Sequence, residues 1–138
     1  MEKRNLTCIR CPLGCSLVVT IDGDNIDVTG NTCKRGYDYG VKEVTNPTRV
    51  VTTTVPVSDG VDLRVSCKTS GDVPKDKMID VIKDLTEVSI NAPVAIGDVI
   101  KANVANTGID IVATKNVSKK KSNLKATEVP KHEYKKAI

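Results

Sequence analysis

Four of the five cysteines in this chain of 138 residues lie close to its N-terminus. They are Cys8, Cys11, Cys15 and Cys33, with the spacing C-x2-C-x3-C-x17-C. Thiols stay reduced in the cytoplasm, and clustered cysteines there favour a shared metal over disulfides. Closing a short loop around a metal costs little chain entropy, and thiolates hold soft metals strongly. The sequence therefore predicts that these cysteines are the metal ligands of an N-terminal module.

The spacing favours an iron–sulfur cluster and leaves zinc as the main alternative, followed by a redox dithiol or inert thiols. Structural zinc sites usually combine two C-x2-C pairs, whereas here Cys15 follows Cys11 by four residues and Cys33 stands alone. Three close cysteines and one remote cysteine are the commoner layout for a four-iron four-sulfur cluster. Pro12 stiffens the loop beside a ligand, and Gly14 lets main-chain N–H groups approach sulfur. We expect a four-iron four-sulfur cluster.

The residues between the third and fourth cysteines predict a β-hairpin. Within residues 16–29, apolar residues alternate at Leu17, Val19 and Ile21 and again at Ile26 and Val28, and Asp22-Gly23-Asp24-Asn25 forms the turn. This hairpin returns Cys33 to the other cysteines. A metal centre with four thiolates carries a charge of about −2, which neighbouring cations stabilise. We expect Lys34 and Arg35 to lie beside the cofactor, with ordinary surface positions as the alternative.

The stretch from Cys8 to Gly36 resembles the N-terminal iron–sulfur domain of the molybdopterin oxidoreductases. Those domains carry C-x2-C-x3-C, a hairpin, and a fourth cysteine followed by a lysine and a glycine. Here Arg35 takes the place of the lysine, and Gly36-Tyr37 follows. The segment before the fourth cysteine is shorter than in those enzymes, and the residues that hold the pterin are absent. The resemblance implies a cluster bound by the four cysteines and no molybdenum chemistry.

Over its whole length the chain is similar to an uncharacterised four-cysteine family of anaerobic bacteria and archaea, described as metal-binding. Members accompany flavin-dependent oxidoreductases and dehydrogenases, so the resemblance implies a redox partner of that kind. The similarity extends through Val55-Pro56-Val57, Val73-Pro74-Lys75, Ala92-Pro93-Val94, Gly97-Asp98-Val99 and residues 107–114.

The middle of the chain predicts a linker, a second hairpin and a helix. Residues 37–49 have no clear period, which favours a linker. The hairpin is expected in 50–57 and 61–68, with Val61, Leu63, Val65 and Cys67 on one face. Cys67 is then a buried apolar residue, with a fifth ligand or a reactive thiol as alternatives. A helix opens at Asp72-Val73-Pro74 and ends near Glu87, with a buried stripe of Met78, Ile79, Ile82 and Leu85.

Strand character returns from Ile90 to Thr114, which completes the predicted fold. We expect an α+β protein, with a metal-anchored β-hairpin module in residues 1–45 and a small β-rich domain with one main helix in residues 46–114. The chain has no Phe and no Trp, so its core must consist of Val, Ile, Leu, Ala and Thr. Such a small core stabilises a fold only marginally, and a metal is expected to add stability.

The net charge of +4 comes from the last part of the chain, residues 115–138. Residues 115–138 hold eight lysines and two glutamates, so we expect a basic, flexible tail. Nucleic-acid binding is not expected, because base-stacking aromatics are absent from this tail apart from Tyr134. His132 is the only histidine, which disfavours histidine-based catalysis.

The cellular location is expected to be the cytoplasm. No segment approaches the roughly 18 apolar residues of a membrane span, and Met1 to Leu17 lacks the apolar stretch of a secretory signal.

Together these features predict a small iron–sulfur electron-transfer accessory protein for an anaerobic flavin-dependent oxidoreductase or dehydrogenase subunit. The alternative is a zinc-binding structural or interaction module without a redox role. No catalytic constellation is present, so we expect no catalytic activity from the chain on its own.

Overall fold

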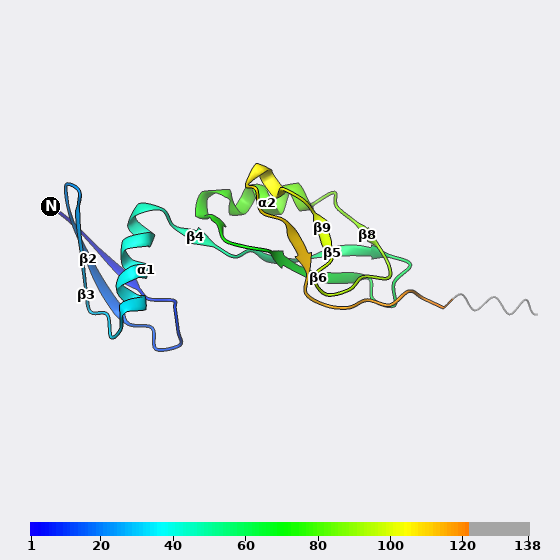
Figure 1. Cartoon of the computed structure of the whole chain (residues 1–138), viewed down its shortest axis with the longest axis horizontal. Helices are drawn as coiled ribbons and strands as arrows, with labels where there is room; N and C mark the ends of the chain where they lie inside the picture. The colour runs from blue at the N-terminus through cyan, green and yellow to red at the C-terminus, as the bar shows by residue number, and fades with distance from the viewer. Residues whose placement is uncertain (122–138) are drawn as a thin grey trace, which may run out of the picture.

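The computed structural model describes residues 1–121, which form two modules along one axis, each with its own hydrophobic core (Figure 1). The expected α+β class is confirmed. No helix among the described residues is long and apolar enough to cross a membrane. The N-terminal module contains β1 (Glu2–Thr7), β2 (Ser16–Asp22), β3 (Asn25–Thr29) and α1 (Lys34–Thr45).

A larger sheet module follows, with a five-stranded sheet in the order β8-β5-β6-β10-β9. Two very short strands, β4 and β7, pair with each other at the junction between the modules. The elements after residue 45 are β4 (Thr48–Arg49), β5 (Thr52–Ser58), β6 (Arg64–Thr69), β7 (Val73–Pro74), the 3-10 turn Lys75–Lys77, α2 (Met78–Leu85), β8 (Ile90–Asn91), β9 (Val99–Lys101), the 3-10 turn Val104–Asn106 and β10 (Ile111–Ala113).

The predicted N-terminal hairpin is confirmed, because β2 and β3 pair antiparallel, with Asp22 opposite Asn25 at the turn. Strand β1 pairs with the other edge of β2. Side chains alternate along each strand, so Leu17, Val19 and Val28 share the face that α1 covers. This sheet brings the residue after β3 back to the start of β2, where the first three cysteines lie.

The linker predicted for residues 37–49 is wrong, since α1 runs to Thr45. The helix packs on the sheet through Gly36 and Gly40, which are both buried. A Cβ atom on Gly40 would lie 2.8 Å from Cγ1 of Val28, so only glycine allows this close approach. Glycine adds no apolar side chain to a periodic pattern, and the buried face of α1 was therefore invisible to hydrophobic periodicity.

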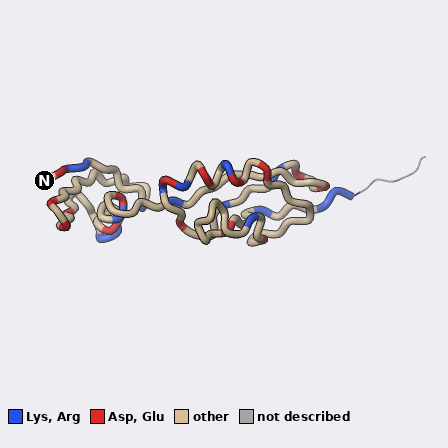
Figure 2. Tube along the Cα trace, turned by 90° about the horizontal axis from the view of Figure 1, so that it is seen from above, with Lys and Arg blue, Asp and Glu red and all other residues tan. Residues whose placement is uncertain are grey.

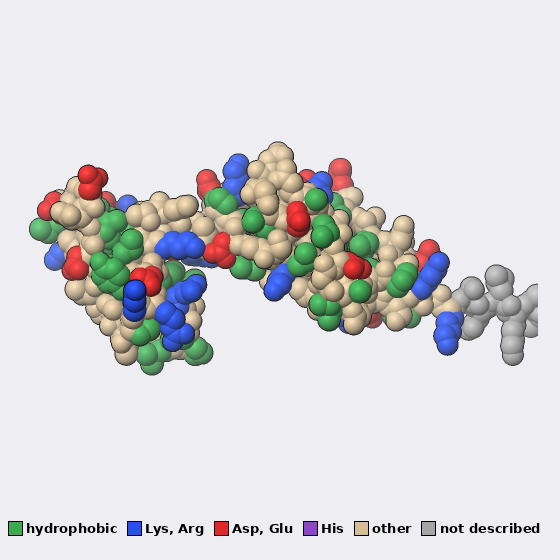
Figure 3. Space-filling model, in the orientation of Figure 1, with side chains coloured by type: hydrophobic (Ala, Val, Ile, Leu, Met, Phe, Trp, Pro, Cys, Tyr) green, Lys and Arg blue, Asp and Glu red, His purple; other side chains and the backbone are tan. Residues whose placement is uncertain are grey.

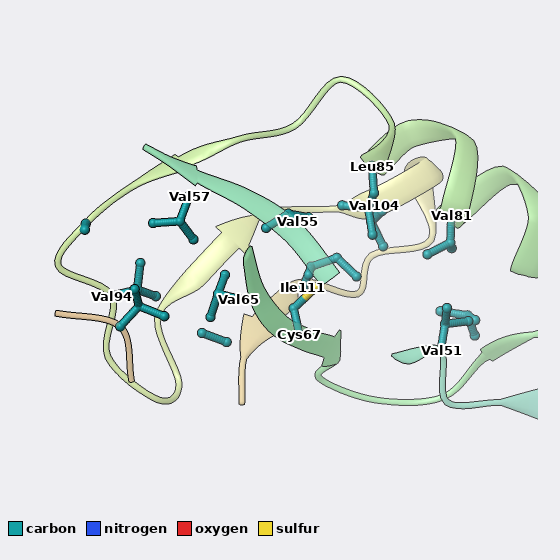
Figure 4. Packing of buried hydrophobic residues seen from close by; sticks show 14 residues of the cluster. Val51, Val55, Val57, Val65, Cys67, Val81, Leu85, Val94, Val104 and Ile111 are labelled. Carbon is teal, nitrogen blue, oxygen red and sulfur yellow. The ribbon is translucent and has the colours of Figure 1, made fainter. Parts of the chain in front are cut away.

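The core of the sheet module is made mainly of valine (Figure 4). Strands β5 and β6 pair antiparallel, and β5 also pairs parallel with β8. Cys67 on β6 is 1% exposed, which confirms the prediction that it is buried. The buried residues of this cluster are Val51, Val55, Val57, Val65, Cys67, Val73, Val81, Leu85, Ala92, Val94, Val104, Ile111, Ala113 and Val117.

Two details of the predicted hairpin and helix differ from the structure. Val61 and Leu63 are 57% and 76% exposed, because the connection after β5 is longer than a turn and β6 begins only at Arg64. Helix α2 begins at Met78 after a 3-10 turn and buries Val81 and Leu85. Ile79 and Ile82, predicted to be core residues, are 63% and 41% exposed.

The sheet module extends beyond residue 114, where its end was predicted. Val117 is 1% exposed, and its backbone exchanges two hydrogen bonds with Val94, at 2.9 and 2.8 Å. Residues 115–121 of the predicted tail therefore belong to the sheet module, and basic residues lead away from its far end (Figure 2). The rest of the predicted tail, with His132 and Tyr134, lies outside the described residues.

Ion pairs join α1 to the sheet module. The Glu43 side chain is 9% exposed and accepts hydrogen bonds from both terminal nitrogens of Arg49, at 2.8 and 2.9 Å. Lys75 donates to the same carboxylate at 2.9 Å. Lys42 and the Thr48 hydroxyl both donate to Asp72. The hydrogen bond from Arg49 is the main cause that holds the pKa of Glu43 below its ordinary value.

The glycine face of α1 gives a first prediction. Gly40→Ala should destabilise the N-terminal module by roughly 1–2 kcal/mol, because overpacking against Val28 outweighs the gain in helix propensity. Thermal unfolding followed by circular dichroism measures this change. The control Asp38→Ala, at an exposed position of the same helix, should leave stability unchanged or raise it. A Gly40→Ala variant at least as stable as the parent would contradict the packing described here.

The Glu43 carboxylate gives a second prediction. Glu43→Gln should lower the free energy of unfolding by about 1–3 kcal/mol at neutral pH, because Arg49 and Lys75 lose a buried charged acceptor. The pKa of Glu43 is lower in the folded protein, so its contribution is present above the ordinary value of 4.5 and is lost as the pH falls through the lowered pKa.

Unfolding of the parent and of Glu43→Gln across pH 2–7 should thus show a stability difference that holds at neutral pH and closes only in acid. Asp62→Asn, which removes an exposed ion pair with Lys115, is the control and should change stability by less than about 1 kcal/mol. An equally large effect of the control, or a difference independent of pH, would contradict the assignment.

Candidate metal centre

The first three cysteines lie on one loop of residues 8–15, which we call the cysteine loop. Its base is closed by a backbone hydrogen bond from the N–H of Cys8 to the carbonyl oxygen of Cys15, at 2.8 Å. Gly14 has φ +62°, a left-handed conformation that favours glycine and turns the chain back into β2. Cys8 is 5% exposed, and Cys11 and Cys15 are half-buried. The loop therefore presents its thiols at one end of the sheet.

Cys33 occupies the N-cap position of α1, with extended backbone angles. No side chain caps this end of the helix, and the first turn contains no acidic residue. The free N–H groups of a helix N-terminus favour a negative charge, and a thiolate can supply it. The backbone N–H of Gly36 is the largest influence that holds the pKa of the Cys33 thiol below its ordinary value, followed by the side chain of Arg35.

Cys15 is linked to the segment that precedes Cys33. Its sulfur lies 3.2 Å from the hydroxyl oxygen of Thr32, and this contact is the main cause that lowers the pKa of the Cys15 thiol. The charge of Cys33 acts in the opposite direction on Cys15. The third and fourth cysteines of the sequence are therefore neighbours in the fold.

Gly36 brings the first turn of α1 against Cys8. A Cβ atom at Gly36 would lie 3.8 Å from the Cys8 sulfur and 3.0 Å from Cβ of Asn31. A side chain at this position would be crowded by Asn31 and would make an ordinary contact with the Cys8 thiol, so the glycine lets the first turn of α1 pack closely on Asn31. The N-terminus of α1 and the cysteine loop meet at Cys8.

The two predicted cofactor-binding cations follow Cys33 on the first turn of α1, and both are exposed. The pKa of Arg35 is raised, first by its hydrogen bond to Cys33 and then by the charges of Cys33, Cys11 and Cys8. Arg35 therefore lies within electrostatic reach of three thiols. Lys34 takes part in none of the ion pairs formed within residues 1–121.

The thiols surround the end of α1 without forming a coordination shell. Within residues 1–121, no group of three or more His, Cys, Asp or Glu side chains is placed to hold a metal ion. Cys67 lies in the core of the sheet module, where burial raises the pKa of its thiol. The assignment of Cys8, Cys11, Cys15 and Cys33 as ligands stays a prediction, and its donor chemistry suits iron or zinc.

A pocket of about 360 Å³ lies beside this centre, at the junction of the modules. The cysteine loop contributes Ile9 and Arg10 to its lining, and α1 contributes Arg35 and Tyr39. The acids Glu43 and Asp72 also line it, but both already pair with bases of the junction. The pocket thus connects the cysteine loop to the ion pairs that hold the modules together.

Sequence reasoning missed three residues that shape this site. Thr32 contacts Cys15, Gly36 admits Cys8, and Arg10 lies between two cysteines and lines the pocket. The spacing of Gly36 and Gly40, one helical turn apart, was the one available signal for a closely packed helix. Thr32 and Arg10 carry no pattern of their own, since their roles depend on the path of the chain.

A family model described as "Protein of unknown function (DUF1667)" matches residues 34–115. The matched span begins one residue after Cys33, so it contains α1 and most of the sheet module and none of the four N-terminal cysteines. None of the curated proteins compared with the chain matches it. The NMR structure of a Clostridium perfringens protein is similar, with 27% identity and a TM-score of 0.49, and the similarity covers 64% of this chain and 98% of that one.

The burial of the cysteines gives a third prediction. In the metal-free full-length chain, Cys33 should react with iodoacetamide on the order of 100-fold faster than Cys67, because Cys33 is exposed and Cys67 is buried with a raised pKa. Mass spectrometry of timed samples measures both rates. In denaturant the two rates should converge. Equal rates in the folded chain would contradict the structure around one of the two residues.

Proposed function

This chain belongs to the DUF1667 family, whose function is unknown, and we propose that it is a small iron–sulfur electron-transfer protein. One observation carries the proposal: thiols from two separate segments meet at the uncapped N-terminus of α1, beside the cation Arg35. The pKa values of the Cys15 and Cys33 thiols lie below their ordinary value, and the thiolate is the form of cysteine that binds a metal. We propose that Cys8, Cys11, Cys15 and Cys33 hold a four-iron four-sulfur cluster.

The local geometry supports this ligand set. Backbone N–H groups of the first turn of α1 point towards Cys33, and Gly36 leaves room beside Cys8. Coordination requires the cysteine loop to close on Cys33. Within residues 1–121 its only backbone hydrogen bond is the one between Cys8 and Cys15 at its base, so Cys11 at the tip can move without breaking others.

When bound, such a cluster accepts and returns one electron at a time, and no covalent bond of the protein breaks. The protein's own residues set the conditions for that exchange. N–H groups and Arg35 compensate the negative charge of the thiolates, which favours the reduced state and raises the potential. The buried Cys8 and the apolar residues behind it keep water from one side of the site.

The proposed partner is an anaerobic flavin-dependent oxidoreductase or dehydrogenase subunit in the cytoplasm. We propose that this protein only relays electrons and that the reaction on a substrate takes place on the partner. The partner proposal is supported by the whole-length resemblance to the four-cysteine family and by the reduced thiols that such a site needs.

The second candidate is a zinc-binding interaction module. It is favoured by the small core of the N-terminal module, which has only four buried apolar residues, Cys8 among them. A core of this size rarely holds a module together without a disulfide or a metal. Zinc on the same four thiolates would stabilise the fold equally well and would carry no electrons.

Metal content decides between the two candidates and is the fourth prediction. Protein purified without oxygen should contain about four iron and four sulfide per chain, absorb near 400 nm and bleach with dithionite. One zinc per chain and no sulfide under the same conditions would sink the electron-transfer proposal. Purification in air is no test, because oxygen destroys exposed clusters and zinc can then occupy the thiolates.

The ligand assignment is tested by paired variants. Cys33→Ser should lose most of the metal and destabilise the N-terminal module, whereas Cys67→Ser should keep the metal content of the parent, since Cys67 lies in the other module. Equal metal loss from both variants would refute the assignment.

A further inference from the structure

Two large apolar side chains of the short cysteine loop are exposed to solvent. Ile9 is 60% exposed and Leu13 is 66% exposed. They flank Cys11 at two residues on either side, and the exposed Pro12 lies between Cys11 and Leu13. The only other exposed large apolar residues within residues 1–45 are the N-terminal Met1 and Tyr37. An apolar surface is thus concentrated on the segment that holds three of the four thiols.

Basic residues surround this apolar tip. Arg10, Lys34 and Arg35 are exposed, and residues 8–15 and 31–36 contain no acid. The acids Asp22, Asp24 and Asp27 gather instead around the hairpin turn, at the other end of the module. Figure 3 shows acidic atoms at the upper end of this lobe and again beside the basic atoms lower down, with hydrophobic atoms at its lower edge. The tip of the N-terminal module is therefore more basic than its hairpin turn, although Asp38 lines the pocket beside Arg10 and Arg35.

We infer that the tip formed by Ile9, Arg10, Leu13, Lys34 and Arg35 is the docking surface for a protein partner whose own apolar contact patch has an acidic rim. This inference rests on the proposed function and names the surface that the partner would contact. The apolar residues would be buried on docking, and the basic residues would pair with carboxylates around them.

The position of the surface suits a partner that exchanges electrons. Cys11 lies between the two exposed apolar residues, so a docked protein would approach the thiols closely without entering the fold. The positive end would also be drawn to an acidic partner first, because opposite charges steer encounter and orientation. The acidic hairpin turn would repel the same partner and so oppose the reversed orientation.

Other occupants fit this surface less well. Two copies of the chain meeting through the same tip would place like charges together, which opposes a symmetric dimer. Nucleic acid is disfavoured because the cysteine loop offers no aromatic side chain for base stacking. An acidic protein surface with an apolar patch complements both the charge and the apolar side chains of the tip.

The test uses the full-length, metal-loaded chain and a flavodoxin, an acidic flavoprotein, as the probe. Titration calorimetry should detect saturable binding at 20 mM salt that weakens roughly tenfold at 200 mM salt, because salt screens exposed charges. Arg10→Gln with Lys34→Gln should weaken binding by about tenfold, and Ile9→Ser with Leu13→Ser by at least as much. The matched control, Asp22→Asn with Asp24→Asn, should bind as tightly as the parent or more tightly.

Carbodiimide cross-linking locates the contact independently, since it joins lysines to carboxylates in contact. Lys34 should be the principal cross-linked residue of the N-terminal module, whereas Lys3 should stay unmodified. No saturable binding at low salt, equal effects of tip and control variants, or cross-links elsewhere would overturn the inference. Concentration-dependent dimerisation lost in Ile9→Ser with Leu13→Ser would assign the surface to a second copy and overturn it too. If the protein contains zinc in place of iron but still binds flavodoxin through the tip, the electron-transfer proposal is wrong and the docking inference stands.

Discussion

The contact between the glycine face of α1 and the N-terminal sheet is the interaction on which the rest of the site depends. Gly40 lets the helix backbone approach Val28, and Gly36 lets its first turn approach Asn31, with Cys8 beside it. Because Cys33 is the N-cap of α1, the N–H groups of the first turn lie beside its thiol. The ion pairs of Glu43 then fix the other end of the helix to the sheet module.

Sequence patterns predicted the elements in which buried apolar residues recur at regular intervals along the chain. The hairpin of β2 and β3 and the burial of Cys67 are examples, and both are confirmed. Helix α1 was missed because its two fully buried positions are Gly36 and Gly40, which add nothing to a pattern of hydrophobic residues, although Tyr39, Val41 and Val44 also pack against the core. The buried face of α2 was misassigned because Ile79 and Ile82 are apolar and exposed, while Val81 faces the core. Periodicity alone does not say which of two adjacent apolar stripes faces inward.

In the candidate site, too, some features could be predicted from the sequence and others could not. The four cysteines could be proposed as ligands from their residue type and spacing, and that assignment stays a prediction. Their surroundings could not be predicted, because Thr32, Gly36 and Arg10 act only through positions that the fold creates. Local spacing determines which thiols can share a metal, and long-range packing determines which donors and charges surround it. The sequence alone therefore indicates which thiols could share a metal, but it does not indicate which donors and charges surround them.

The stability of the two modules differs in a way that connects the metal to the fold. The sheet module has a continuous core of fourteen buried residues, and valines supply the bulk that its missing aromatics would provide. The N-terminal module has four, and one of them is a candidate ligand. In a module this small the free energy of metal binding is largely free energy of folding, whichever metal is bound. Redox chemistry and structural stabilisation are therefore not competing uses of the four cysteines, since a cluster would supply both and zinc only the second. The sheet module, with its own core and its own buried cysteine, does not depend on either metal and gives the N-terminal module a stable platform.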